Sequence, residues 1–95
     1  MITIKIRALF HLKDMLGARE LTLKLKEGAT IKDLIQILIE RYGDKVESVL
    51  IGPNGKLNPI ITILVNGLQI DFFNGINTTL ADGDTVSFIP PVGGG

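Results

Sequence analysis

The residues with the clearest chemical use end the chain, as Pro90-Pro91-Val92-Gly93-Gly94-Gly95. Gly95 brings a terminal α-carboxylate, and the glycines before it have no Cβ, so they can pass through channels too narrow for other residues. Pro90 and Pro91 act in the opposite way, because a proline ring fixes φ, removes a donor and favours a stiff extended course. Six such residues span ~20 Å at ~3.3 Å each. We therefore expect an extended, flexible tail over 90–95 that presents Gly95 to another protein's active site.

A glycine-rich end is more often only a frayed terminus. Here the glycines follow a predicted final strand closely and end at the carboxyl group, which favours a chemical role. A carboxylate is a poor electrophile because its negative charge repels nucleophiles. Conversion to an acyl-adenylate with ATP would open the Gly95 carbonyl to attack by a sulfur donor or a thiol. The sequence contains no machinery for these steps, so partner enzymes are required.

The remaining candidate sites are weaker. The chain has no cysteine, and its single histidine, His11, has no obvious partner for a zinc site. No serine or threonine has a histidine nearby in sequence. The segment 52–56 is similar to a phosphate-binding loop but lacks the required first glycine and the final Ser or Thr, so a simple turn is predicted. We expect a protein that is not an enzyme, with no metal and no bound cofactor.

Length and charge limit the class of protein. Ninety-five residues make one domain. Ten basic and ten acidic residues give a formal net charge of +0, so no bulk field attracts nucleic acid or an anionic membrane. The N-terminus alternates like a strand and not like a signal peptide, and apolar bursts such as 60–65 are far shorter than the ~20 residues of a membrane helix. We expect a cytoplasmic protein.

Periodicity predicts the elements. Alternating apolar and polar residues predict strands over 2–10, 20–26 and 84–89, and an apolar burst predicts another over 60–66. Asn66-Gly67 predicts a type I′ hairpin that returns the chain over 68–71. The stretch 44–58 is the least determined, with a short helical turn followed by a turn at 53–55.

The segment after Thr30 predicts the main helix. Thr30 is a good N-cap, and Asp33 three residues later gives an acidic form of the capping box. Gly43 provides a stop at the C′ position. One apolar stripe lies between them at helical spacing, formed by Ile31, Leu34, Ile35, Leu38, Ile39 and Tyr42. These features predict a helix over 31–42.

One amphipathic helix must cover one face of a single sheet. The outer strands form hairpins, and the helix makes the one long crossover, so the first and last strands become parallel neighbours. This arrangement is an α+β, ubiquitin-like β-grasp with a single mixed sheet and one main helix. The predicted organisation is a domain over 1–89 followed by the tail over 90–95.

Several short segments together carry a resemblance to a known family, although each alone is weak. They are Leu9-Phe10, Gly28-Ala29-Thr30 with Asp33-Leu34, Leu64-Val65-Asn66-Gly67, Leu80 with Asp82-Gly83-Asp84, and Pro90-Pro91-Val92. Through them essentially the whole chain resembles the MoaD/ThiS sulfur carriers, and most of all the small subunit of molybdopterin synthase. The Pro-Pro-Val segment and the long stretch 44–58 favour this molybdopterin branch over the shorter thiamine carriers.

The resemblance implies a sulfur carrier. A ubiquitin-activating-type adenylyltransferase would use ATP to adenylate Gly95, and a sulfur donor protein would supply the sulfur of a thiocarboxylate. The tail would then enter the large subunit of molybdopterin synthase, with Gly94 beside Gly95 in the channel. There its sulfur would pass to a pterin precursor and form the dithiolene of molybdopterin. Gly93 stands where the family usually has Ala, Ser or Thr, and Lys13-Asp14 stands where it often has Arg-Glu.

We expect the partner to contact residues beyond the reach of a core of this size. Ile89, Pro91 and Val92 are apolar residues of this kind, and clustered exposed apolar groups often mark interfaces. Gly93 completes this predicted partner-binding set.

A function of a different class stays open. Several archaeal proteins of this shape are attached to lysines of other proteins, as ubiquitin is. Both routes begin with the same adenylate, so the sequence does not separate carrier from modifier. An interaction domain with an inert tail is the third interpretation.

Overall fold

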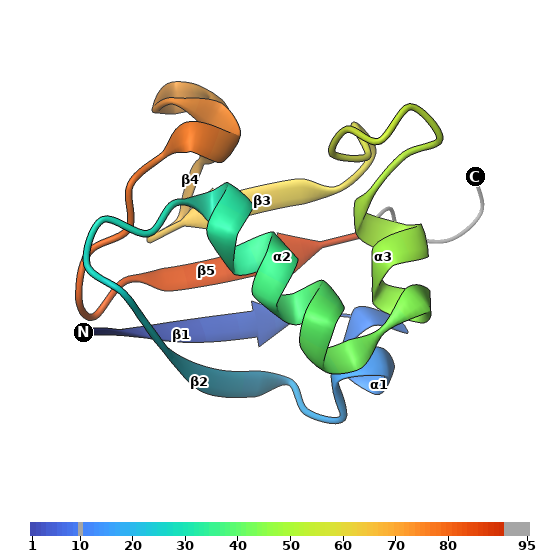
Figure 1. Ribbon diagram of the computed structural model, residues 1–95, viewed down its shortest axis with the longest axis horizontal. Helices are drawn as coiled ribbons and strands as arrows, with labels where there is room; N and C mark the ends of the chain where they lie inside the picture. The colour runs from blue at the N-terminus through green and yellow to red at the C-terminus, as the bar shows by residue number, and fades with distance from the viewer. Residues whose placement is uncertain (10, 91–95) are drawn as a thin grey trace.

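The structure, a computed structural model that describes residues 1–9 and 11–90, places one sheet behind one long helix (Figure 1). Its elements in chain order are β1 (Ile2–Ala8), α1 (His11–Leu16), β2 (Glu20–Leu25), α2 (Ile31–Tyr42), α3 (Asp44–Leu50), β3 (Thr62–Val65), β4 (Leu68–Gln69), the 3-10 helices η1 (Ile70–Phe72) and η2 (Gly75–Asn77), and β5 (Thr85–Ile89). The described strands form a single sheet in the order β2-β1-β5-β3-β4. The predicted single sheet under one main helix is confirmed.

The first and last strands are parallel neighbours. β1 pairs with β5 from Lys5 opposite Thr85 to Ala8 opposite Phe88. The other neighbours, β1 with β2, β3 with β5 and β3 with β4, are antiparallel. A mixed sheet in which the last strand lies between β1 and β3 is the predicted β-grasp, which the structure confirms.

α2 begins and ends at the predicted residues. Asp33 N donates to Thr30 Oγ1 at 3.3 Å and Thr30 N donates to Asp33 Oδ2 at 2.9 Å, so both halves of the capping box form. Gly43 has a φ of 84°, and its N–H donates to the Ile39 carbonyl at 2.8 Å. A left-handed φ of this kind is easily adopted only by glycine, which explains the stop.

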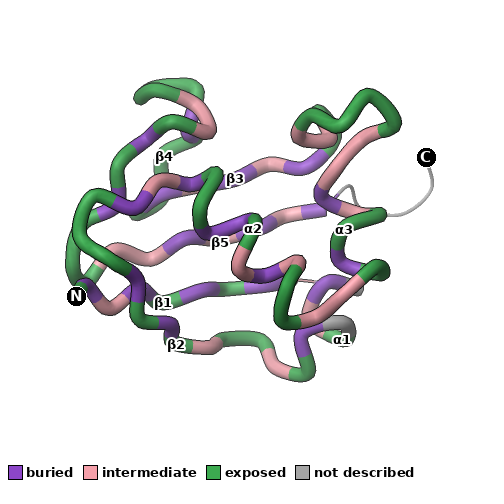
Figure 2. The backbone as a smooth tube through the Cα atoms, viewed as in Figure 1, coloured by how far each residue is buried: buried purple, intermediate pink, exposed green. Residues whose placement is uncertain are grey.

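The core lies between α2 and the sheet, where buried residues alternate with exposed ones along the strands (Figure 2). Ile4, Ile6, Val86 and Phe88 are at most 1% exposed. Burying a side chain of this size stabilises the fold by ~1.5–3 kcal/mol relative to leaving it exposed. These contacts hold β1 and β5 in fixed positions, and β5 leads directly to the C-terminal residues.

α1 and α3 close the core at the end of the sheet where β1 and β5 finish (Figure 1). Leu12 from α1 and Val46 and Leu50 from α3 are buried there. α3 is thus a complete short helix where the sequence indicated only a helical turn. In the described part of the chain, no helix has the length and apolar composition needed to cross a bilayer.

β3 begins later than predicted. The expected strand starts at residue 60, whereas pairing starts at Thr62. Ile61 N donates to the Asn58 carbonyl at 3.1 Å, so the chain is still turning before the strand begins. Ile60 is 59% exposed as a result.

The predicted hairpin after β3 is present, but its second strand is short. Asn66 and Gly67 have φ values of 51° and 88°, the positive pair that a type I′ turn requires. β4 ends at Gln69, because η1 begins at the next residue and turns the side chain of Ile70 into the core. A strand continuing to residue 71 would have left the edge of the core uncovered.

The segment 52–56 is a closed turn. Gly52 N donates to the Lys56 carbonyl at 2.7 Å, and Gly55 N donates to the Gly52 carbonyl at 3.0 Å. Lys56 N donates to Asn54 Oδ1 at 3.1 Å. Because these amides bond within the loop, they do not form a phosphate cradle, and the predicted simple turn is confirmed.

Candidate functional site

The candidate site begins where β5 ends. Within β5, Ser87 lies opposite Arg7 of β1 on one side and opposite Leu64 of β3 on the other. β5 is therefore the central strand of the sheet and is hydrogen-bonded along both edges. Pro90 follows its last residue, Ile89, directly.

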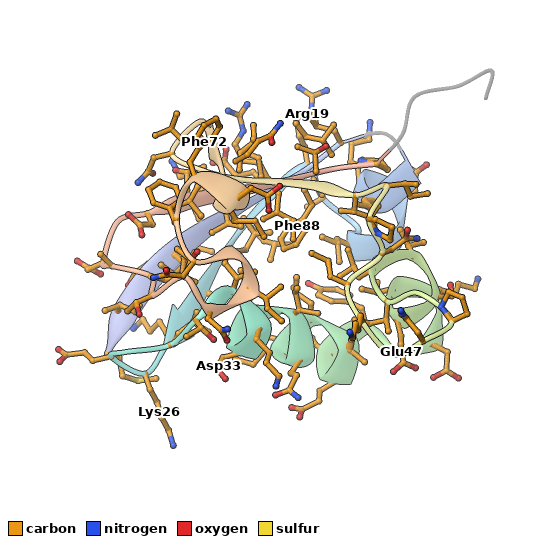
Figure 3. All side chains as sticks on the ribbon, turned by 90° about the horizontal axis from the view of Figure 1, so that it is seen from above. Arg19, Lys26, Asp33, Glu47, Phe72 and Phe88 are labelled. Atoms are coloured by element: carbon orange, nitrogen blue, oxygen red, sulfur yellow. The ribbon has the colours of Figure 1, made fainter. Side chains whose placement is uncertain are left out.

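The last described residues alternate between the core and the bare face of the sheet. Phe88 is 1% exposed and points between the sheet and α2 (Figure 3). Ile89 follows on the opposite face and is half-buried. Pro90 is less than 2% exposed, so the buried part of the molecule reaches at least this residue. Sequence reasoning had placed Pro90 at the start of the tail.

The predicted reactive residues lie outside the described residues. These are Gly94 and Gly95, and the predicted partner contacts Pro91, Val92 and Gly93 lie there too. Only Ile89 of the predicted site is described, and it occupies the bare face of the sheet beside the exit from β5. The roles assigned to all six residues stay predictions.

Leu64, which shares the bare face of the sheet with Ile89, was missed by the sequence analysis. Thr62 lies opposite Ile89, and two residues along β3 Leu64 lies opposite Ser87. These side chains are half-buried and share the sheet face that α2 leaves uncovered. Leu64 was treated as part of a buried apolar burst. In the structure it alternates with Ile63 and Val65, which are buried, but the three residues are all apolar and the sequence does not show this difference.

The Lys13-Asp14 pair lies at the same end of the molecule. Both belong to α1, which lies beside the end of β1 (Figure 1). Lys13 is half-buried and Asp14 is exposed.

The described residues were compared with the side-chain clusters that bind metal ions. Within 1–9 and 11–90, no group of three or more His, Cys, Asp or Glu side chains is arranged to hold a metal ion. No side-chain polar atom buried in this part of the chain lacks a hydrogen-bond partner.

Comparison with known proteins agrees with this architecture. Residues 10–95 match the ThiS family. Small archaeal modifier protein 3 of Haloferax volcanii is 30% identical over 92 residues, which cover 97% of this chain and 98% of the relative. A putative sulfur carrier protein of Archaeoglobus fulgidus is 38% identical over 69 residues, covering 73% of this chain and 77% of the relative.

Solved structures extend the similarity to the whole fold. Small archaeal modifier protein 1 of Haloferax volcanii superposes with a TM-score of 0.83 at 26% identity, covering 98% of this chain and 99% of that one. A putative molybdopterin converting factor subunit 1 of Pyrococcus furiosus has a TM-score of 0.78 at 26% identity, covering 97% of this chain and 100% of that one. CysO from the BexX/CysO complex of Amycolatopsis orientalis has a TM-score of 0.76 at 26% identity, covering 97% of this chain and 99% of that one. The chain belongs to the ThiS/MoaD family of ubiquitin-like sulfur carriers.

Proposed function

We propose that this protein carries sulfur on its C-terminal glycine. A ubiquitin-activating-type adenylyltransferase uses ATP to form the Gly95 acyl-adenylate, and a sulfur donor protein converts it to the thiocarboxylate. The observation that carries this proposal is that the Gly93-Gly94-Gly95 sequence follows the central strand of a family β-grasp after Pro90-Pro91-Val92. The domain contributes binding and position, and the partner enzymes contribute the chemistry.

The preferred recipient of the sulfur is a pterin precursor, held by the large subunit of molybdopterin synthase. Two sulfur transfers of this kind form the dithiolene of molybdopterin. The Pro90-Pro91-Val92 segment supports this assignment, as does the similarity to the putative molybdopterin converting factor subunit 1 of Pyrococcus furiosus. The protein would bind no cofactor of its own.

In this scheme the tail residues have distinct tasks. Gly95 carries the adenylate and then the sulfur, and Gly94 keeps the channel passage free of a Cβ. Pro91, Val92 and Gly93, together with Ile89 on the sheet, contact the partner. Leu64 extends the same contact surface, because it is half-buried on the same bare face as Ile89.

A second function is favoured by a specific similarity. The Haloferax volcanii relative that aligns over 97% of this chain is named a modifier protein. Attack on the Gly95 adenylate by an enzyme thiol, followed by transfer to a lysine amine, would give an isopeptide bond in place of a thiocarboxylate. Carrier and modifier roles share the first step and differ only in the nucleophile.

Mass spectrometry of the protein purified from its own cells tests the proposal. An intact mass shifted by one oxygen-to-sulfur exchange at Gly95 is the expected result. Isopeptide bonds that join the Gly95 carboxyl group to lysines of other proteins, with no thiocarboxylate, would assign the modifier role. A pterin-dependent loss of the thiocarboxylate in the presence of the large synthase subunit identifies the recipient, and its persistence there would exclude the pterin route.

A further inference from the structure

The two edges of the sheet differ in how far they are open. At one edge β4 has only two residues, and the 3-10 helices η1 and η2 follow it at once. At the other edge β2 runs over Glu20–Leu25 and pairs residue by residue with β1, without a bulge or a proline. No described element lies beyond β2 (Figure 1). Proteins usually shorten, bend or cover such an edge, because it is a template for pairing with another strand.

The backbone of β2 offers hydrogen-bonding groups at this open edge on alternate residues. Ala8 N donates to the Arg19 carbonyl at 2.8 Å, so the main-chain groups of Arg19 face β1. Because main-chain groups alternate in direction along an antiparallel strand, those of Glu20, Thr22 and Lys24 point away from β1. We call these three residues the edge triplet.

The edge triplet is complementary to a second copy of itself. Two identical antiparallel strands pair around a two-fold axis, so each contact occurs twice. An axis centred on Thr22 places Glu20 of each copy opposite Lys24 of the other, and it places Thr22 opposite Thr22. Every outward main-chain group of the triplet then has a partner, and each opposite pair of side chains is favourable.

Other registers lose this complementarity. An axis centred on Lys24 brings two lysines together, and an axis placed before the triplet's centre leaves the lysine without a carboxylate opposite. An axis centred on Leu23 places Glu20 opposite Lys26, which lies beyond the end of β2. The Lys26 carbonyl already accepts from Ala29 N at 3.1 Å, at the turn that leads to α2.

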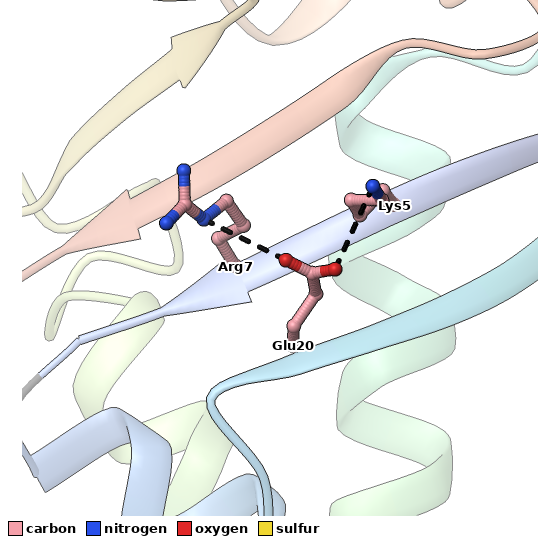
Figure 4. A network of polar contacts seen from close by, with 3 residues as sticks. All are labelled: Lys5, Arg7 and Glu20. Carbon is pink, nitrogen blue, oxygen red and sulfur yellow. Dashed lines mark ion pairs between the residues drawn. The ribbon is translucent and has the colours of Figure 1, made fainter.

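The ion pairs within one chain leave both charges of the triplet available. Lys24 lies opposite Thr3, and no carboxylate of residues 1–9 and 11–90 comes within ion-pair distance of it. The Glu20 carboxylate lies 3.6 Å from Lys5 Nζ and 3.8 Å from Arg7 Nε (Figure 4). Both distances exceed the ~2.7–2.9 Å of a charge-assisted hydrogen bond, so this carboxylate can still accept from a further cation.

The opposite face of β2 is also compatible with the pairing. Leu21 is half-buried, whereas Leu23 is 4% exposed. The axis at Thr22 places Leu21 of each copy opposite Leu23 of the other, on the side of the sheet that α2 covers. Apolar residues therefore meet apolar residues across the axis, and polar residues meet polar residues, as a continuous sheet requires.

We infer that β2 is an interface between two copies of this chain, which pair edge to edge around an axis at Thr22 and form one continuous sheet. A strand from an unrelated protein can also add to an open edge, but the order of charges along the triplet selects a second copy. β1 separates β2 from β5, so the pairing leaves the end of β5 uncovered in both copies. The inference holds for a carrier and for a modifier alike.

Exchanging the two charges of the triplet tests the inference. Glu20→Lys and Lys24→Glu each place like charges opposite each other in a pair of identical chains, so each variant alone should associate at least roughly tenfold more weakly than the unmodified chain. A mixture of the two variants restores both opposite-charge pairs and is expected to form a heterodimer. A chain with both changes should again pair with itself. Sedimentation equilibrium of the full chain measures each Kd.

Two controls separate pairing from folding. Lys45→Glu makes the same charge change at an exposed position in α3 and should associate like the unmodified chain. The chain with both changes also contains Glu20→Lys, so its recovery excludes damage to the fold as the reason for the loss in the single variant. An unmodified chain that stays monomeric at high concentration would overturn the inference, and so would a mixture of the two single variants that forms no heterodimer.

A disulfide at the axis tests the register independently. The chain has no cysteine of its own, so Thr22→Cys introduces a single thiol at an exposed position. Opposite residues of a hydrogen-bonded antiparallel pair have Cα atoms about 5.5 Å apart, which is within the range of a disulfide. Mild oxidation should therefore link two copies of this variant much faster than two copies of Ser48→Cys, which is exposed in α3. Equal rates for the two variants would overturn the pairing at Thr22.

Discussion

Asn66 and Asp84 join two turns at the end of the sheet opposite the exit of the chain. Asn66 Nδ2 donates to Asp84 Oδ1 at 2.9 Å, while Asn66 Oδ1 accepts from Thr85 N at 2.9 Å. Asp84 Oδ2 in turn accepts from Ala81 N at 2.8 Å. The β3–β4 hairpin is thereby tied to the start of β5. This network fixes where the last strand begins, and its register with β1 and β3 follows.

Replacing Asn66 by Ala is therefore expected to destabilise the fold. The change removes two side-chain hydrogen bonds and replaces Asn, which tolerates a φ of 51°, by Ala, which does not, so we expect the free energy of unfolding to fall by about 2 kcal/mol. Urea unfolding measures this. Asn66→Gly is the control, because it loses the bonds but accepts the backbone angle, and its loss should be smaller. An Ala variant as stable as the unmodified chain would refute this role.

Pro90 is expected to stabilise the fold as well as to direct the chain. It is buried, and its ring restricts the unfolded chain, so Pro90→Ala should lower the free energy of unfolding by about 1 kcal/mol. Pro53→Ala, at an exposed turn position, is the matched control and should change the melting temperature less. If the two variants melt alike, Pro90 belongs functionally to the tail and not to the domain.

The elements that could be predicted from the sequence are those with local determinants. The capping box at Thr30 and Asp33 and the stop at Gly43 defined α2. Alternation placed β1, although the strand ends at Ala8 and not at residue 10 as expected. The end of β4 was missed because it depends on a distant requirement, the burial of Ile70 against the core. Leu64 was missed because an apolar burst does not tell whether both faces of a strand are covered. The ion pairs of Glu20 with Lys5 and Arg7 (Figure 4) depend on side-chain geometry that no pattern records.

The surface formed by Ile89 and Leu64 is expected to contribute to partner binding. Ile89→Thr keeps the β-branched side chain that strands favour but removes apolar contact area, so affinity for the adenylyltransferase should fall by at least ~1 kcal/mol. A calorimetric titration measures it, beside a melting curve. Ile60→Thr changes an equally apolar residue that is 59% exposed and lies before β3. Equal affinities for the two variants would remove this surface from the interface.

The last two glycines are expected to be essential for activity and dispensable for folding. A Trp at position 94 adds bulk where a narrow channel admits only glycine, and deletion of Gly95 leaves the carboxylate ~3.5 Å short of the nucleotide. Both changes should abolish or nearly abolish ATP–pyrophosphate exchange. Deletion leaves a new Gly-Gly end, so it is expected to retain more exchange than Gly94→Trp. Neither should change the free energy of unfolding by more than ~0.5 kcal/mol, since glycines bring no side chain to bury.

Gly93→Ala provides the matched control, because the family usually has a small side chain at this position. It should leave both exchange and melting temperature near those of the unmodified chain. Exchange by Gly94→Trp at the unmodified rate would remove the tail from the mechanism. A large drop in its melting temperature would instead assign the tail a structural role. Only loss of exchange in a fully folded Gly94→Trp protein, with Gly93→Ala active, agrees with a terminal glycine that is threaded into a partner and activated there.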